Sequence, residues 1–143
     1  MFKSIKSLEI NNNFYNKYIS LLNTFNKTDI SFLFFTDFVK NLSNNHDIFI
    51  LFDPSNNNII GTVTLLFEQK LIHNGKYVCH IEDLIISDEY KNNRYGTLFL
   101  KFIKNYAKIK DCYKIILNCS QNIKDFYSKN NFLNRNIEMS YYY

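Results

Sequence analysis

No apolar run in this sequence is long enough to span a membrane. The N-terminus, Met1 to Lys6, also lacks a continuous apolar stretch followed by a small-residue cleavage site. These absences argue against a membrane protein and against a secreted one. Internal repeats and domain linkers are missing too, and tryptophan is absent, but 46% of the 143 residues are hydrophobic and 17% are aromatic. That apolar content offsets chain entropy, so we expect one folded domain, residues 1–143, in the cytoplasm.

Dense basic runs and metal-ligand spacings are missing as well. The 17 basic and 13 acidic residues give a net charge of +4 and are spread along the chain. This distribution argues against a nucleic-acid partner and favours small anionic ligands. Cys79, Cys112 and Cys119 lie in apolar, strand-like contexts. We therefore expect buried free thiols in a reducing compartment, and no metal site.

Hydrophobic periodicity predicts an α+β protein. Apolar residues spaced by three and four indicate helices, whereas β-rich runs bounded by turn signals such as Asp53-Pro54-Ser55 and Asn74-Gly75 indicate strands. Asp29 or Ser31 is the expected cap of the second helix. In chain order we predict two helices (14–25 and 31–42), three antiparallel strands (48–52, 59–67 and 77–87), a loop-led helix (98–106), a strand (113–119), a helix (122–129) and a last strand (137–142). This order gives a mixed, mostly antiparallel central sheet flanked by helices.

The segment from Ile81 to Gly96 carries the first chemical signal. A strand that runs into a polar loop and then opens a helix presents backbone N–H groups at the positive end of that helix, where a pyrophosphate can bind. The loop resembles the acetyl-CoA loop of GNAT acetyltransferases, with Lys91 as the basic first residue and Gly96 as the last glycine. Arg94 stands where that family usually has its first glycine. The resemblance implies acetyl-CoA as cosubstrate, held by Leu84, Ile85, Ile86, Lys91, Asn92, Asn93, Arg94, Tyr95 and Gly96.

Neighbouring motifs narrow the resemblance. The segments 68–73 (EQKLIH), 80–83 (HIED), 112–119 (CYKIILNC) and the pair Phe126-Tyr127 occur in this order. Together they resemble the signature of glucosamine 6-phosphate N-acetyltransferases over residues 59–139. The resemblance implies N-acetylation of D-glucosamine 6-phosphate to N-acetyl-D-glucosamine 6-phosphate, in UDP-N-acetylglucosamine biosynthesis. It also implies a homodimer whose C-terminal strand helps to build the partner's sugar site. The implied substrate-binding residues are Lys70, Leu71, Ile72, His73, Glu82, Asp83 and Glu138.

Three residues are candidates for catalysis. Glu82 is the candidate base that removes the ammonium proton, directly or through water. Tyr127 is placed by the resemblance near the CoA sulfur, where a phenol can protonate the leaving thiolate. Asn118 occupies a position that is commonly acidic in the resembling enzymes. Ile123 stands where an asparagine usually precedes the Phe-Tyr pair, although Asn122 is one residue away.

Each candidate also has a purely structural interpretation. Glu82 and Asp83 are adjacent, so on a regular strand they face opposite sides and one of them points into the sheet interior or a cleft. A carboxylate in an apolar strand is usually paired or functional. Lys70 by itself is a solvated charge, His73 lies beside a turn, and Tyr127 is one of 11 tyrosines that can fill a core.

Two other functions that involve CoA stay open at this stage. One is a GNAT acetyltransferase that acts on another amine, such as a protein N-terminus or a polyamine. The other is a module that binds CoA without turnover, which the departures at Arg94, Asn118 and Ile123 motivate. A basic nucleic-acid module comes third.

Overall fold

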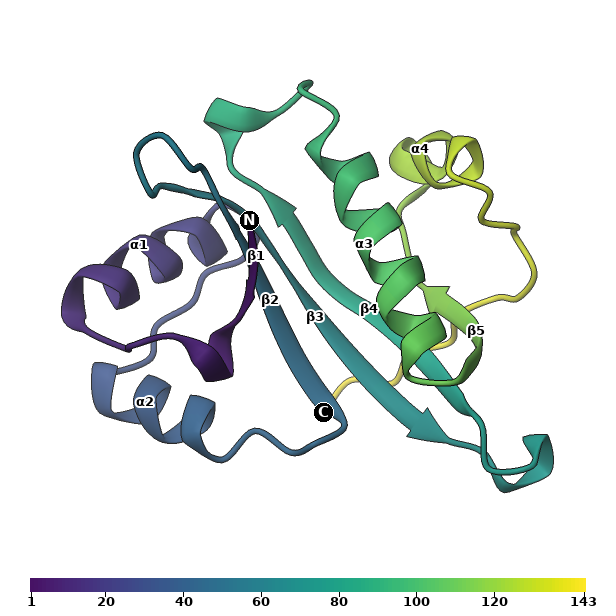
Figure 1. Cartoon of the computed structure of the whole chain (residues 1–143). Helices are drawn as coiled ribbons and strands as arrows, with labels where there is room; N and C mark the ends of the chain where they lie inside the picture. The colour runs from purple at the N-terminus through teal and green to yellow at the C-terminus, as the bar shows by residue number, and fades with distance from the viewer.

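The computed structural model describes residues 1–143 and has one five-stranded sheet (Figure 1). The strands lie in the order β1-β2-β3-β4-β5. Neighbours pair antiparallel except β4 and β5, which are parallel because α3 connects them. The strands are β1 (Phe2–Ser4), β2 (His46–Phe52), β3 (Ile59–Gln69), β4 (Tyr77–Ile86) and β5 (Cys112–Leu117).

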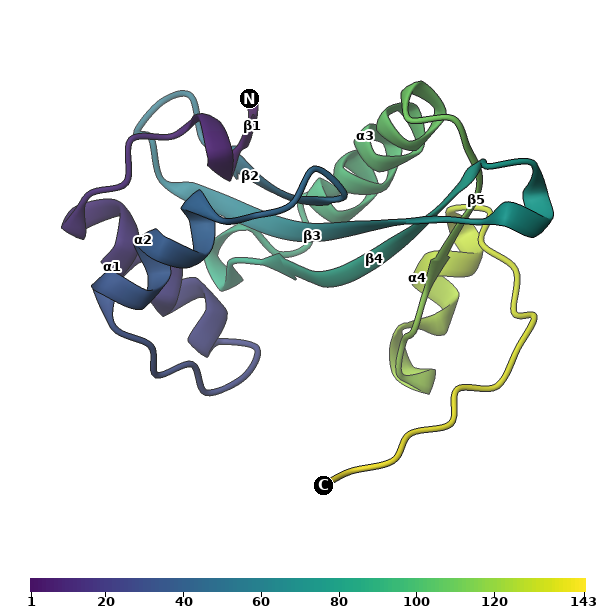
Figure 2. The same cartoon turned by 90° about the horizontal axis from the view of Figure 1, so that it is seen from below.

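Helices cover both faces of the sheet. Helices α1 (Asn12–Asn23) and α2 (Phe32–Lys40) lie on one face, and α3 (Tyr95–Ile109) lies on the other (Figure 2). Helix α4 (Lys124–Lys129) packs beside α3 at the β5 edge. Asn11 caps α1 by accepting from the Phe14 N–H at 2.9 Å, and Ser31 caps α2 by accepting from the Phe34 N–H at 3.1 Å. Each such cap stabilises a helix by about 1 kcal/mol.

Alternation along the strands divides the core into two layers. In β2, Ile48 and Ile50 face α1 and α2, whereas Phe49 and Leu51 face α3. The α3 layer is centred on Phe99, Leu100 and Ile103, all of which are fully buried. Full burial of one such side chain contributes roughly 1.5–3 kcal/mol, so the two layers hold the sheet between its helices. The predicted α+β class is therefore confirmed.

The predicted helices and central strands agree with the structure within a few residues. Ser31, not Asp29, is the cap of α2. Strand β1 was not predicted, since its three residues are too few to show a period.

The predicted last strand, 137–142, is wrong. The chain has no regular secondary structure after α4, and the C-terminal segment runs away from the sheet (Figure 2). The alternating apolar residues Ile137 and Met139 are 92% and 93% exposed. Alternation alone does not make a strand, because a strand also needs an edge to pair with.

No helix has the length and apolar character that a membrane span requires.

The expectation of buried free thiols holds for one cysteine of the three. All three are free thiols, but only Cys79 is buried, whereas Cys112 is half-buried and Cys119 is exposed. Cys119 lies beyond the end of β5, outside the core layer that buries Cys79.

Candidate active site

A β-bulge in the middle of β4 creates the site. Glu82 pairs with Thr64 of β3 and Ile85 pairs with Thr62, so two β4 residues, Asp83 and Leu84, lie opposite one β3 residue. Asp83 is the extra residue and adopts a left-handed backbone with φ +48°. Such a bulge interrupts the alternation of side chains. The expectation that Glu82 and Asp83 face opposite sides is therefore wrong, and both line one cavity on the α1–α2 face of the sheet.

Strands β4 and β5 separate just beyond this point. Their parallel pairing ends at Ile81 and Leu117, where β5 itself ends. Glu82 and Asn118 therefore stand level with each other at the opening. The predicted cosubstrate residues Leu84, Ile85 and Ile86 follow on β4, where the edge that faces β5 has no ladder partner. A splayed strand pair with free backbone groups can admit an extended ligand between its strands.

The carboxylates of Glu82 and Asp83 have no partner. Neither takes part in any ion pair of the chain. Burial raises the pKa of the Glu82 carboxyl, and the neighbouring charge of Asp83 raises it further. His80 acts in the opposite direction, and Glu138 adds to the increase. A carboxylate whose pKa moves toward neutrality is better suited to accept a proton at physiological pH.

Tyr127 combines a buried ring with a free hydroxyl. The ring is 9% exposed and packs edge-on against Phe126 and Phe132. Its hydroxyl makes no hydrogen bond within the chain and is not among the buried polar atoms that lack a partner, so it reaches accessible space. Burial raises the pKa of this phenol, and the nearby Cys119 adds to the increase. The hydroxyl therefore stays protonated at neutral pH and can donate.

The loop before α3 leaves an open helix N-terminus. The first backbone bond into α3 runs from the Leu98 N–H to the Arg94 carbonyl at 3.1 Å. The N–H groups of Tyr95, Gly96 and Thr97 thus lack a helical partner, and no side chain caps them. This end of a 15-residue helix carries partial positive charge and no acidic residue in its first turn. Backbone of this kind fits the diphosphate of CoA.

The same loop shows how the departures from the family pattern are accommodated. Arg94 has φ +62° and Asn92 has φ +64°, both in the left-handed region that favours glycine. Lys91 forms an ion pair with Asp88. The Tyr90 hydroxyl donates to Asp53 at 2.8 Å and anchors the start of the loop to the turn between β2 and β3. Asn93 donates its side-chain amide to the Lys91 carbonyl at 3.3 Å.

Gly96 is required by a close approach. A β-carbon at this position would lie 2.9 Å from Cζ of Phe126. The helix that begins at the loop therefore packs directly on the residue before Tyr127. This contact joins the proposed phosphate end of the site to its proposed acid.

Of the predicted substrate-binding residues, Glu82 and Asp83 line the cavity, whereas Lys70, Leu71, Ile72 and His73 do not. Lys70 and His73 belong to the turn between β3 and β4, where Leu71 and Ile72 are 92% and 86% exposed. Lys70 pairs with Glu68, whose other oxygen lies 3.2 Å from Nε2 of His80. The His73 ring stacks on Tyr113 with ring centroids 3.9 Å apart. Within one chain this turn and the cavity are separate, and Glu138 is exposed in the C-terminal segment.

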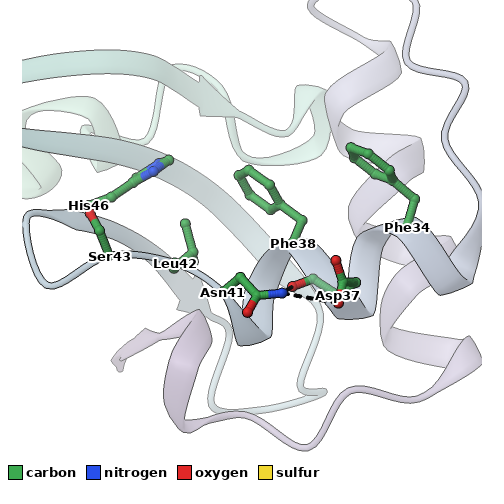
Figure 3. A pocket seen from close by; sticks show the side chains of 7 residues that line it. All are labelled: Phe34, Asp37, Phe38, Asn41, Leu42, Ser43 and His46. Carbon is green, nitrogen blue, oxygen red and sulfur yellow. Dashed lines mark hydrogen bonds between the residues drawn. The ribbon is translucent and has the colours of Figure 1, made fainter.

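Sequence reasoning did not single out His46, which also lines the cavity. His46 opens β2 and lies close to Phe38, with ring centroids 5.8 Å apart (Figure 3). Its Nε2 is the one buried side-chain nitrogen or oxygen in the chain without a hydrogen-bond partner. No motif marks His46, because it lines the same cavity as Glu82 only through the pairing of β2, β3 and β4.

Comparisons with known proteins agree with this geometry. Residues 13–132 match the acetyltransferase (GNAT) family. The chain is 29% identical over 105 residues to glucosamine 6-phosphate N-acetyltransferase of Arabidopsis thaliana, an alignment that covers 73% of this chain and 70% of that protein. It is 32% identical over 104 residues to glucosamine 6-phosphate N-acetyltransferase of Schizosaccharomyces pombe, covering 72% of this chain and 93% of that protein.

A solved structure extends the likeness to the whole fold. The crystal structure of the Arabidopsis thaliana glucosamine-6-phosphate N-acetyltransferase superposes with a TM-score of 0.82 at 26% identity, covering 100% of this chain and 99% of that one. For some relatives the shared segment is only part of the protein, such as 66% of the length of the Dictyostelium discoideum glucosamine 6-phosphate N-acetyltransferase 1.

Proposed function

This chain belongs to the acetyltransferase (GNAT) family, and from that premise we propose that it acetylates the 2-amine of D-glucosamine 6-phosphate with acetyl-CoA. The observation that carries the proposal is the pair of unpartnered carboxylates, Glu82 and Asp83, at the point where β4 leaves β5. The similarity to glucosamine 6-phosphate N-acetyltransferases supports this choice of acceptor. The product, N-acetyl-D-glucosamine 6-phosphate, would enter the synthesis of UDP-N-acetylglucosamine.

Acetyl-CoA, when bound, supplies an acetyl thioester. The open N-terminus of α3 would hold its diphosphate, with Arg94 adding charge from the preceding residue. The free edge of β4 at Leu84, Ile85 and Ile86 would hold the arm and donate a backbone N–H to the thioester carbonyl. A donor in that position stabilises a developing oxyanion, and loss of one typically costs about 3 kcal/mol.

Glu82 and Asp83 orient and deprotonate the acceptor. The ammonium group is attracted to both carboxylates, and Glu82, whose pKa is raised, takes the proton. The neutral amine is then held beside the thioester, so that orientation supplies much of the acceleration. Asn118 stands level with Glu82 and would position the amine through its side-chain amide. No covalent enzyme intermediate is required.

Tyr127 completes the transfer. Its hydroxyl is protonated, accessible and free of internal partners, as a proton donor to a leaving thiolate must be. The thiolate would leave as the N–C bond forms and would take the phenol proton, and the phenolate would recover a proton from the nitrogen that becomes the amide.

The 6-phosphate and the rest of the sugar need groups that lie outside the cavity. Lys70, Leu71, Ile72 and His73 are on the β3–β4 turn, and Glu138 is on the free C-terminal segment. We propose that a cytoplasmic homodimer brings these elements to the site, with the C-terminal segment of one protomer reaching its partner. The exposed Ile137 and Met139 would become buried in that contact.

The deciding experiment measures thiol release from acetyl-CoA with glucosamine 6-phosphate and with unphosphorylated glucosamine. We expect turnover that depends strongly on the 6-phosphate. Equal turnover with both sugars, or turnover only with polyamines or peptide N-termini, would refute the proposed acceptor. Binding of CoA without thiol release from any amine would indicate a module that does not catalyse.

A further inference from the structure

The cavity that contains Glu82 and Asp83 is mostly apolar. It has a volume of about 400 Å³ and lies between α1, α2 and the sheet. Its walls come from aromatic and aliphatic side chains of both helices and of β2 and β3, and its polar groups gather at the sheet. The lining residues are Tyr18, Leu22, Ile30, Phe34, Phe35, Phe38, His46, Ile48, Thr64, Leu66, Glu82 and Asp83.

This lining does not suit a sugar phosphate. It includes no lysine and no arginine, so a phosphate placed here would meet two carboxylates and no cation. The basic residues predicted for the phosphate lie on the β3–β4 turn instead. The apolar part of the cavity therefore stays unexplained by the proposed acceptor.

The helix side of the cavity exposes large aromatic surface. Phe34 and Phe38 lie one turn apart on α2 with ring planes nearly parallel, and they are 57% and 40% exposed. Figure 3 shows their rings and that of His46 directed to the same side, in the neighbouring hollow that shares these three residues. Exposed aromatic rings and carboxylates in one cavity together favour a ligand that has a cationic group and an apolar substituent.

His46 gives an independent sign of a ligand. Its Nε2 is buried without a partner, and its pKa is lowered by burial first and by the charge of Lys6 second. A neutral imidazole nitrogen left without a hydrogen bond is unfavourable unless a ligand or a water fills the space beside it.

We propose that this cavity admits a second class of acceptor, small primary amines that carry an aromatic or branched aliphatic group. The proposal rests on the proposed acetyl transfer at Glu82. The ammonium group lies between Glu82 and Asp83, and the apolar group packs against the exposed rings of Phe34 and Phe38. Glu82 takes the ammonium proton, the amine nitrogen bonds to the acetyl carbon of acetyl-CoA, the C–S bond breaks, and the thiolate takes the Tyr127 proton. The second proton, which the nitrogen loses as it becomes an amide, returns to the Tyr127 phenolate. The products are the N-acetylated amine and CoA.

The test compares acceptors on the same full-length protein. Thiol release from acetyl-CoA is measured with 2-phenylethylamine, with ethanolamine, which has no apolar group, and with glucosamine 6-phosphate. We expect 2-phenylethylamine to react with a kcat/KM at least about ten-fold above that of ethanolamine, since burial of an apolar group of this size favours binding by that factor or more.

A matched pair of variants on α2 locates the effect. Phe38→Ala removes a cavity wall, whereas Leu33→Ala removes a side chain of the same helix that is 78% exposed and does not line the cavity. We expect Phe38→Ala to lower the ratio of kcat/KM for 2-phenylethylamine to that for glucosamine 6-phosphate by about ten-fold, and Leu33→Ala to leave the ratio unchanged.

The outcomes separate this inference from the proposed function. Turnover of glucosamine 6-phosphate without turnover of 2-phenylethylamine overturns the second acceptor class alone. Turnover of neither acceptor overturns the acetyl transfer at Glu82, and the second class with it. Equal loss of the ratio in both variants places the apolar amine outside the cavity and also overturns the inference.

Discussion

Acidic side chains at two places on the same sheet have different surroundings: Asp47 is buried, whereas Glu82 is half-buried and Asp83 is exposed. Asp47 on β2 is satisfied on all sides, because Lys6 lies 3.1 Å and Lys110 3.8 Å from its carboxylate and the Tyr106 hydroxyl donates to it at 2.7 Å. Glu82 and Asp83 on β4 have no such partner. A buried charge that is fully paired ties elements together, whereas carboxylates that have no partner in the chain are free to bind a ligand.

Two tyrosines repeat the contrast. Burial and the bond to Asp47 raise the pKa of Tyr106, whose hydroxyl is occupied. Burial also raises the pKa of Tyr127, whose hydroxyl is free. The same residue type thus serves a structural bond in one place and is available for proton donation in the other. Exchanging single atoms at the two places tests this division.

The largest effect is expected for Glu82→Gln, which keeps the shape of the side chain and removes the base. Turnover with glucosamine 6-phosphate should fall by about 10²- to 10⁴-fold, the usual contribution of a general base. Stability should not fall. The pKa of Glu82 is higher in the folded state than in the unfolded state. As pH rises from the unfolded-state pKa through the folded-state pKa, this carboxyl therefore lowers the free energy of unfolding, and glutamine removes that decrease. Steady-state kinetics and chemical denaturation at pH 7 measure the two effects.

The pH profile gives a second readout for the same residue. In the parent protein kcat/KM should rise with pH through an acid limb above the ordinary glutamate pKa, because Glu82 must lose its proton to act. In Glu82→Gln that limb should disappear. An unchanged acid limb in the variant would assign the base to another group.

Tyr127→Phe removes the hydroxyl that has no partner in the chain and should lower turnover by about ten-fold to a hundred-fold. The free energy of unfolding should barely change, since the hydroxyl has no internal partner. Tyr106→Phe is the matched control and should do the reverse, with lower stability and normal turnover. If both variants lose stability and neither loses turnover, Tyr127 is a core residue only.

Asp47→Asn tests the paired group and should act on stability. Hydrogen bonds to a charged group contribute roughly 1.5–3 kcal/mol, and the partial exposure of Lys6 and Lys110 reduces this to about 1–2 kcal/mol. That loss corresponds to about a five-fold to thirty-fold change in the folding equilibrium. Denaturation midpoints measure it, and kcat with saturating substrates should stay at the parent value. A loss of kcat at full folding would contradict the division between the two groups.

The helix N-termini extend the comparison to the backbone. Asn11 and Ser31 satisfy the starts of α1 and α2, whereas α3 begins uncapped after a left-handed Arg94. Arg94→Gly should weaken CoA binding by about ten-fold and reduce its dependence on salt, because a charge-assisted contact is lost. The free energy of unfolding should stay within about 1 kcal/mol of the parent value, since glycine relieves the positive φ but adds chain entropy. Calorimetry at low and moderate salt decides, and tighter binding at both would exclude a phosphate contact.

The local parts of this architecture could be predicted from the sequence. Helix α1 has the apolar spacing of Tyr18 and Leu21, and Ser31 is a cap by its own chemistry. The Asn74-Gly75 pair marks the β3–β4 turn, where both residues have positive φ. Each of these signals depends on residues within a few positions of one another.

The site required information that no local pattern contains. The left-handed Asp83 that turns two carboxylates to one side depends on how β4 pairs with β3. The paired state of Asp47 depends on Lys6, which lies 41 residues before it, and on Lys110, the residue that follows α3. The predicted C-terminal strand had the right alternation, but its residues pair with no strand of the sheet. Each of these features depends on contacts between residues that are far apart in the sequence, and composition does not contain that information.

The contact between Gly96 and Phe126 sets the distance between the two ends of the proposed CoA site. The diphosphate and the sulfur of CoA are opposite ends of one arm, and in the proposed complex the first is held at Gly96 and the second beside Tyr127. Because the Phe126 ring rests on the α-carbon of Gly96, the two ends of the site keep a constant separation. A larger residue at position 96 would push α4 outward and leave the acid out of register with the sulfur, even if every group that touches the ligand were intact.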